Sequence, residues 1–314
     1  MTSTNRTPLV LAVLALPPWA WFLVRDLSPR FDVFAIGMPL FLAVGLAGAV
    51  VVTAVARVHR GAVAAVAASW LLFASAVIVG PWSPTGGEPP VEGVRLAAAN
   101  VRGRVMNPVA LNDLLAQDAD VLVVGEMLPA LLRPLGETYE YSSAGRGSFD
   151  VVVYSRWPLV PLDDPPDVVA RYGVAVQVLA PGGAFVLYGL HLPRPSYPIT
   201  AAYEAGLRSH RRLIEDLVAA IEAEPLPVVV AGDLNLTDRG GGYRALSEAE
   251  HDAMRANWAG PTSVRWWPLL LRIDHVFVPP TWCADDSRRF EIADSDHKGV
   301  SATIGACAST AGSG

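Results

Sequence analysis

The sequence carries little charge for its length. Charged residues make up 17% of its 314 residues, whereas hydrophobic residues make up 52% and the mean hydropathy is +0.35. Soluble domains typically contain about 25% charged residues. This composition excludes a disordered or fibrous chain, and it makes a wholly soluble protein an awkward interpretation.

The signatures of several enzyme classes are also missing. Two cysteines are too few for a cysteine zinc cluster. The sequence has no P-loop, no Gly-x-Gly-x-x-Gly stretch and no Gly-x-Ser-x-Gly elbow. Ser295, Asp296 and His297 are consecutive and therefore cannot form the relay of a serine hydrolase.

Long apolar runs are present, and all of them precede Pro84. They occupy residues 7–24, 33–56 and 61–82, and each is close to the roughly 20 residues that cross a bilayer core as a helix. We predict three transmembrane helices in a membrane domain at residues 1–83. The alternatives are a cleaved signal peptide for the first run, which lacks a small-residue cleavage site, and buried core helices for the others.

The charges between these runs predict an orientation. The second loop contains Arg57, His59 and Arg60 and no acid, so the positive-inside rule places it in the cytoplasm. We therefore expect a multi-pass protein of the cell membrane, with a bilayer around its three helices and with all residues after Trp82 extracytoplasmic.

The remainder of the chain lacks excess positive charge. Residues 1–85 hold five arginines and two aspartates, or +3, which leaves −9 for the rest of the formal charge of −6. Broad, sequence-independent binding to polyanions depends on a basic surface. The acidic part is therefore a poor candidate for that kind of binding.

A Pro- and Gly-rich stretch at 84–93 predicts a short linker, followed by a domain at 94–306 and a tail at 307–314. Short apolar runs alternate with amphipathic segments in the domain. We predict helices at 107–117 and 201–223, and strands at 94–100, 120–125, 149–155, 174–180, 184–191, 227–231, 272–278, 289–292 and 299–304. This mixture predicts an α/β fold with two packed sheets flanked by helices.

Polar residues lie at the ends or edges of these predicted strands. Each one alone has an ordinary explanation as a turn or capping residue. Together they predict a shared cleft, because strand ends on a rigid scaffold present side chains to a common site. The set comprises Asn100, Glu126, His191, Asp233, Asn235, Asp274, Asp296 and His297.

The motifs around these residues resemble those of the endonuclease/exonuclease/phosphatase superfamily, which has the deoxyribonuclease-I-like fold. The resemblance covers residues 94–306 in order and implies a two-sheet sandwich and a divalent-metal phosphodiesterase or phosphatase. It rests on Ala231-Gly232-Asp233-Leu234-Asn235, Arg272-Ile273-Asp274-His275-Val276-Phe277, Ser295-Asp296-His297, Asn100-Val101, Glu126, Tyr154-Ser155-Arg156-Trp157-Pro158 and His191-Leu192.

The residue types suit metal-assisted hydrolysis of a phosphate ester. Hard oxygen ligands bind Mg²⁺ or Mn²⁺, which offsets the charge of the phosphate and polarises its oxygen. We expect Glu126 to be the main metal ligand, with Asn100 and Asp296 beside it. Arg102 and Arg194 flank the site and are candidates to contact the phosphate, although solvated surface arginines are an equal alternative.

Five further residues are candidates for proton transfer and charge stabilisation. Asp274 is expected to orient His297, which would position or deprotonate the attacking water. Asp233 is the alternative base, and the sequence does not choose between them. Asn235 and His191 would donate hydrogen bonds to the non-bridging oxygens of the phosphate.

The two cysteines follow Asp274 and His297 along the chain. If both strands run away from the site, Cys283 and Cys307 finish at the same far end. We expect them to form a disulfide, which an extracytoplasmic location would allow, with free buried thiols as the alternative.

The resulting hypothesis is a membrane-tethered, divalent-metal-dependent phosphoesterase that acts on nucleic acid or on lipid or inositol phosphates. A binding module that kept the fold without catalysis is the contrasting class. No protein partner is evident from the sequence.

Overall fold

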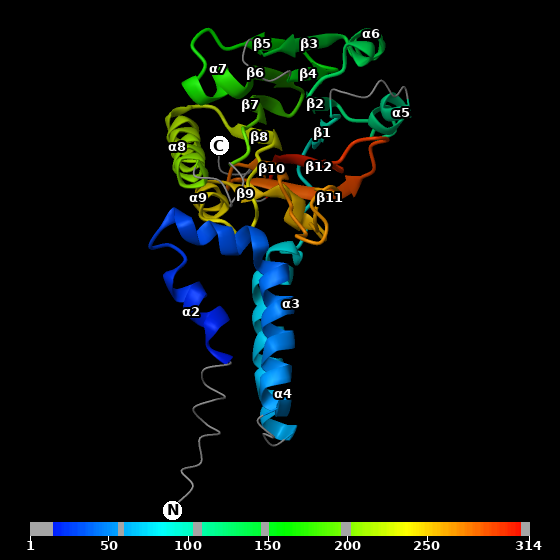
Figure 1. Ribbon diagram of the computed structural model, residues 1–314. Helices are drawn as coiled ribbons and strands as arrows, with labels where there is room; N and C mark the ends of the chain where they lie inside the picture. Colours follow the sequence, from blue (N-terminus) through cyan, green and yellow to red (C-terminus); the bar gives the residue numbers. More distant parts are fainter. Residues whose placement is uncertain (1–14, 56–59, 103–108, 146–150, 196–201, 309–314) are drawn as a thin grey trace, which may run out of the picture.

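Two long apolar helices extend from one side of a mixed α/β domain (Figure 1). The computed structural model describes residues 15–55, 60–102, 109–145, 151–195 and 202–308. The long helices are α3 (Asp32–Val55) and α4 (Arg60–Ala74), and α4 continues through a π turn, η2 (Ser75–Val79), and a 3₁₀ turn, η3 (Gly80–Trp82). They are preceded by α2 (Pro17–Val24) and a 3₁₀ turn, η1 (Pro29–Phe31).

The apolar helices correct the prediction of three membrane spans. Within the described residues, two segments are long and apolar enough to cross a bilayer, Asp32–Val52 and Gly61–Trp82. The described part of the first run forms α2, whose eight residues are too few to cross a bilayer core; residues 7–14 lie outside the described residues. Only 22% and 28% of the two candidate spans are buried, which is unlike the core helix of a soluble protein.

The start of α3 is docked on the domain. Figure 1 shows its first turns lying along the domain, while the rest of the helix runs away beside α4. Pro39 lies inside α3 and has no N–H, so the carbonyl of Ala35 loses its helical donor. Arg239 of the domain replaces that donor, with its Nε 2.9 Å from the Ala35 oxygen. The N–H of Gly241 also donates to Asp32 Oδ1 at 3.2 Å.

Twelve strands in the described part of the chain form two six-stranded sheets. The first has the order β11-β12-β1-β2-β4-β3 and the second β5-β6-β7-β8-β10-β9. Each has one parallel pair at its centre, β1 with β2 and β7 with β8. The first sheet consists of β1 (Val94–Asn100), β2 (Val121–Gly125), β3 (Tyr141–Ala144), β4 (Val152–Ser155), β11 (Trp282–Phe290) and β12 (Gly299–Ala306). The second consists of β5 (Leu159–Pro161), β6 (Gly173–Ala180), β7 (Gly183–His191), β8 (Val228–Asp233), β9 (His251–Asp252) and β10 (Asp274–Val278).

The core lies between the two sheets, because alternate residues of each central strand face inward. Leu96 and Val123 of one sheet belong to the same buried cluster as Leu187, Val229 and Val276 of the other. The architecture is therefore a two-sheet α/β sandwich, as predicted.

Helices cover the outer face of each sheet. The buried sides of α5 (Val109–Leu115) and α6 (Pro129–Thr138) pack on the first sheet. On the second sheet lie α7 (Asp167–Tyr172), α8 (Tyr203–Ala223) and α9 (Gly241–Ala249). The buried side of α8 consists of residues spaced by three and four, namely Leu207, His210, Ile214, Leu217 and Ile221.

Several strands were not predicted, for physical reasons. Strands β3, β5 and β9 are four residues or fewer, too short for a periodic signal. Only the first half of the predicted strand at 289–292 belongs to β11, which runs from Trp282 to Phe290. Charges on β11, including Asp285 and Arg288, hide its pattern, and they suit an edge strand because they discourage pairing with other chains.

The linker and the cysteines are both held against the domain. Backbone hydrogen bonds join Thr85 to Arg255 and Glu88 to Ala284, so the stretch at 84–93 follows the surface of the domain. Cys283 of β11 and Cys307, just after β12, are joined as a disulfide, with their Cα atoms 5.0 Å apart.

Candidate active site

The site forms where the parallel pairs of the two sheets end together. In the first sheet Asn100 pairs with Gly125, and in the second His191 pairs with Asp233. The side chain of Asn100 crosses between the sheets, with its Nδ2 3.0 Å from Asp233 Oδ2. The sandwich therefore brings residues from four central strands to one place.

Asn100 is the hub of this arrangement. Its Nδ2 also donates to Glu126 Oε1 at 3.1 Å, and its Oδ1 accepts the N–H of Arg102 at 2.9 Å. Glu126 has a φ of 48°, a left-handed conformation that turns the chain sharply as it leaves β2. Asn100 is buried, whereas the side chain of Glu126 is 37% exposed, so its carboxylate faces the open side of the site.

Asp274 and His297 meet at the same edge. His297 Nδ1 is 2.9 Å from Asp274 Oδ2, and its Nε2 is 3.8 Å from Asp233 Oδ2. Burial alone lowers the pKa of His297, but the charges of Asp274 and Asp233 and the hydrogen bond to Asp274 raise it to about 10. Burial raises the pKa of Asp274, and neighbouring Asp233 adds to that rise. We place the proton of this pair on the imidazole, because two carboxylates face it.

Asp233 is positioned by its own turn. Gly232 before it has a φ of +134°, and a Cβ there would lie 2.0 Å from the Leu190 oxygen, so only glycine fits. Asn235 after it has a φ of 48° and donates its N–H to Asp233 Oδ1 at 3.0 Å. The Asn235 Nδ2 donates to the Leu192 oxygen at 2.8 Å, which leaves its second N–H to bind a ligand.

His191 lies between two carboxylates. Its Nε2 is 3.6 Å from Asp233 Oδ2 and 3.8 Å from Glu126 Oε1. Its side chain is only 9% exposed. His191 and His297 therefore approach the same oxygen of Asp233, and His191 is also close to Glu126.

Asp296 and the two candidate arginines lie at the rim. Asp296 is within 3.7 Å of Arg102 Nε and of Arg265 Nη1, so its carboxylate lies between two guanidinium groups. Arg194 is exposed and lines a separate cavity beside Asn235. The ion pairs of Asp296 are therefore with these two arginines at the rim, and not with the residues of the Asn100 hub.

Three residues that support the site were missed by sequence reasoning. The Oγ1 of Thr262 accepts the N–H groups of Ile273 and Asp274 at 3.0 and 3.1 Å. The hydroxyl of Ser295 donates to the backbone carbonyl oxygen of Asn100 at 2.7 Å, and Arg265 forms an ion pair with Asp296. Thr262 and Arg265 lie in a loop without periodicity, so only the folded chain reveals them; Ser295 stands within a quoted motif.

A buried arginine holds β10 in place behind the site. Arg272 is fully buried and contacts Asp252 Oδ2 at 2.7 Å and Asp238 Oδ2 at 3.2 Å. The indole N–H of Trp82, at the end of η3, donates to the same oxygen of Asp238. One charged network therefore connects the end of the second apolar helix to the strand that begins with Asp274.

The donor set suits a divalent cation. Glu126, Asp233 and Asp274 contribute three carboxylates to the site, whereas protonated His297 offsets only one of them. Carboxylate oxygens of Asp233 and Asp274 lie within 4.8 Å of one another. Oxygen-rich sites with excess negative charge favour Mg²⁺ or Mn²⁺ over softer metals.

Comparison with known proteins identifies relatives of this arrangement. A model of the endonuclease/exonuclease/phosphatase family matches residues 97–297. A comparison with curated proteins gave no match. Among solved structures, the chain is similar to an endonuclease/exonuclease/phosphatase from Beutenbergia cavernae, with 21% identity, a TM-score of 0.52, and coverage of 68% of this chain and 72% of that one.

Two further structures have similar scores. A humanized TDP2 from D. rerio shows 17% identity and a TM-score of 0.51, over 68% of this chain and 99% of that one. A 3′ phosphatase from Neisseria, bound to a product DNA hairpin, shows 17% identity and a TM-score of 0.50, over 67% and 98%. At such identities the likeness shows a shared fold.

Proposed function

The chain belongs to the endonuclease/exonuclease/phosphatase family, whose members are hydrolases that act on phosphate esters and typically use divalent metals. We propose that this chain is a membrane-tethered, Mg²⁺- or Mn²⁺-dependent phosphoesterase. The observation that carries the proposal is the Asn100 hub, which joins Glu126 to Asp233 beside the Asp274–His297 pair. A binding module would not need these two sets of groups side by side.

Glu126 is the principal metal ligand in this proposal, and Asn100 holds its carboxylate in position. Asp296, which lies at the rim between Arg102 and Arg265, is a further candidate ligand. When bound, the cation offsets the charge of the phosphate and polarises a phosphoryl oxygen. The domain residues alone provide the remaining roles.

Protonated His297 stabilises the negative charge that develops on a phosphoryl oxygen, and Asp274 keeps its ring oriented. Asp233 accepts the proton of the attacking water, because a histidine whose pKa is about 10 is a poor base at neutral pH. The second amide N–H of Asn235 and the ring of His191 donate to the other oxygens. The pKa of His297 therefore favours Asp233 over His297 as the base.

The tether and its orientation belong to the same proposal. Two apolar helices with little burial suit a membrane anchor, and the docking of α3 suits a domain held at the bilayer surface. The basic loop at 56–60 supports a cytoplasmic position for the far ends of these helices, and hence an extracytoplasmic domain.

The full chain in detergent or lipid nanodiscs would be assayed on phosphodiesters and phosphomonoesters with Mg²⁺, Mn²⁺ or EDTA. We expect chelation to abolish turnover and Glu126→Gln to reduce it at least 100-fold. Glu137→Gln is the matched control, since Glu137 is an exposed acid on α6 that pairs with Arg133, away from the site. Equal turnover of Glu126→Gln and the control, or full activity in EDTA, would contradict the proposal.

A further inference from the structure

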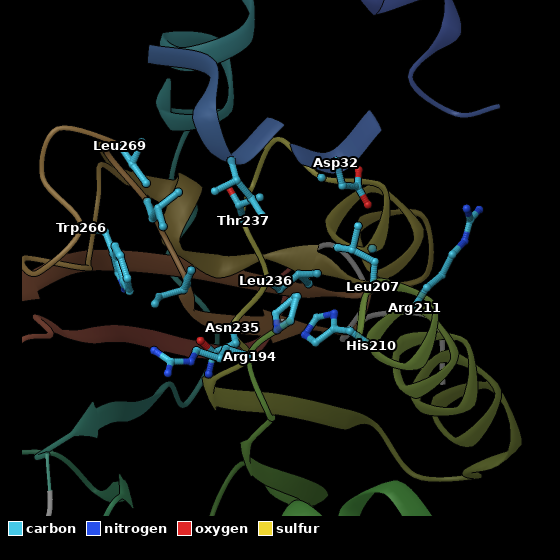
Figure 2. Close-up of a pocket in the computed structure, with 16 residues that line it drawn as sticks. Asp32, Arg194, Leu207, His210, Arg211, Asn235, Leu236, Thr237, Trp266 and Leu269 are labelled. Carbon is cyan, nitrogen blue, oxygen red and sulfur yellow. The ribbon is translucent and has the colours of Figure 1, made fainter. Parts of the chain in front are cut away.

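A cavity lies directly beside the catalytic residues, on the side of the domain that faces the apolar helices. Its volume is about 170 Å³. Figure 2 shows side chains converging on it from α8, from the chain after β8 and from the loop before β10, with the start of α3 passing above. Its apolar wall includes Ile36, Leu207, Leu236, Trp266, Leu269 and Leu271.

The two ends of this cavity have different surroundings. One end is formed by Asn235 and Arg194, which lie next to one another in Figure 2, and Asn235 is also bonded to Asp233 in the active site. The other end is formed by Asp32 and Ile36, at the start of the first candidate membrane span. The cavity therefore connects the reacting groups with the base of the membrane anchor.

The wall between these ends offers few groups to bind a polar molecule. Nε2 of His210 already pairs with the Leu234 oxygen at 3.1 Å, and burial lowers the pKa of this histidine, which keeps it neutral. Thr237 also lines the cavity, and so does Arg211, whose side chain is 47% exposed and pairs with Glu215. A sugar or a nucleobase buried there would lose hydrogen bonds to water that this wall cannot replace.

The size of the cavity sets the length of the occupant. An apolar protein cavity of about 150 Å³ accommodates benzene, so this one has room for about six carbon atoms. A complete lipid tail would exceed it and would have to continue past Ile36 along α3, toward the bilayer. Phosphate at the Asn235 end and hydrocarbon beside Ile36 match an amphiphilic ester, and the Asp32 carboxylate at the second end accepts the N–H of Gly241.

We propose that this cavity binds the first carbons of the apolar chain of a membrane lipid phosphate ester, with the phosphate held between Arg194, Asn235 and the catalytic groups. The proposal rests on the proposed phosphoesterase function and narrows its substrate class to lipid-borne phosphates. An extended nucleic acid would also meet a domain of formal charge −9, whereas a single lipid headgroup presents one phosphate at a time.

Binding can be measured without turnover in EDTA, because the proposed hydrolysis of a phosphomonoester such as hexyl phosphate requires the divalent metal. Calorimetry on the full chain in nanodiscs, with empty nanodiscs subtracted, would compare hexyl phosphate with methyl phosphate. We expect hexyl phosphate to bind at least tenfold more tightly, and Leu269→Trp, which fills the cavity from its rim, to remove that preference. Leu226→Trp is the matched control: this leucine is also partly buried, lies beyond the far end of α8, and should leave the preference unchanged.

Hydrolysis of p-nitrophenyl hexyl and p-nitrophenyl methyl phosphate would then separate this proposal from the proposed function. A lower KM for the hexyl ester that Leu269→Trp abolishes supports both. Equal binding of the two alkyl phosphates, or a hexyl preference that survives Leu269→Trp, overturns the cavity proposal even when both esters are cleaved. Chain-dependent binding without cleavage of either ester retains the cavity and overturns the phosphoesterase function.

Discussion

The contact between Arg239 and α3 predicts a specific double-mutant result. Arg239 is buried and donates to three backbone oxygens, those of Ala35, Leu269 and Leu270, at 2.9, 3.0 and 3.1 Å. The Ala35 oxygen is available because Pro39 provides no helical N–H. Arg239→Met removes all three bonds, whereas Pro39→Ala gives the Ala35 oxygen a new donor within the helix.

The expected cost of Arg239→Met follows from these contacts. A hydrogen bond from a charged donor contributes about 1.5–3 kcal/mol. Burial of the guanidinium group offsets part of this sum, as the lowered pKa of Arg239 shows. We expect Arg239→Met to lower the free energy of unfolding by about 3 kcal/mol. In the Pro39→Ala background this cost should be about 1 kcal/mol smaller, because one of the three bonds is then redundant.

Thermal unfolding of the full chain in detergent would measure these values. A loss of about 3 kcal/mol corresponds to about 6–12 °C in Tm for a protein of this size class. Arg133→Met is the control, because the Arg133 side chain is 89% exposed, and it should change stability by less than about 0.5 kcal/mol. An Arg239→Met cost equal to that of the control, or one that Pro39→Ala leaves unchanged, would refute this account of the docking.

Three further outcomes are expected. Burial raises the pKa of Glu250 to about 8, and its Oε2 has no hydrogen-bond partner among the described residues. The folded protein therefore holds a proton that the unfolded chain releases above about pH 4.5, so stability falls from about pH 5 to 8. In melts at different pH values, Glu250→Gln should raise the free energy of unfolding by about 1–2 kcal/mol at pH 8. Asp274→Asn should lower the pKa of His297, measured by NMR on metal-free protein, and reduce kcat about 10²- to 10⁴-fold; an unchanged pKa would contradict the electrostatic account. Replacing Cys283 and Cys307 by alanine opens a loop with a sequence separation of 24 and should cost about 3 kcal/mol in chemical denaturation, with reductant producing a similar loss in the unmodified chain.

The central strands could be predicted because their residues are almost uniformly apolar and each ends at a polar residue. The amino-acid sequence alone is enough to indicate the family and to group Asn100, Glu126, Asp233, Asp274 and His297 in one site. Asn100, Glu126 and Asp233 follow or end central parallel strands, whose carboxyl ends share one edge of each sheet. Asp274 begins β10 and His297 precedes β12; these strands run antiparallel to β8 and β1, so they start at the edge where their partners end.

Other features required the folded chain. Arg265 and Thr262 belong to a loop whose conformation is set by tertiary contacts, and nothing in their spacing marks them. The cavity lies between α3, α8 and the loop before β10, which are far apart in sequence. The charged edge strand β11 carries no apolar alternation to recognise. Apolar composition, finally, indicated three spans, but composition does not decide how much of the first run forms a helix.

The docking of the domain on α3 also has a kinetic consequence. In the membrane-spanning arrangement proposed above, the catalytic groups stay at one height and in one orientation relative to the bilayer. A substrate carried by the same membrane then reaches them by lateral diffusion in two dimensions, at a high effective concentration. Part of the orientational entropy of the encounter is lost before the two molecules meet. The anchor would thus accelerate turnover of membrane-borne esters without a single contact to them, and would offer no such gain for esters in free solution.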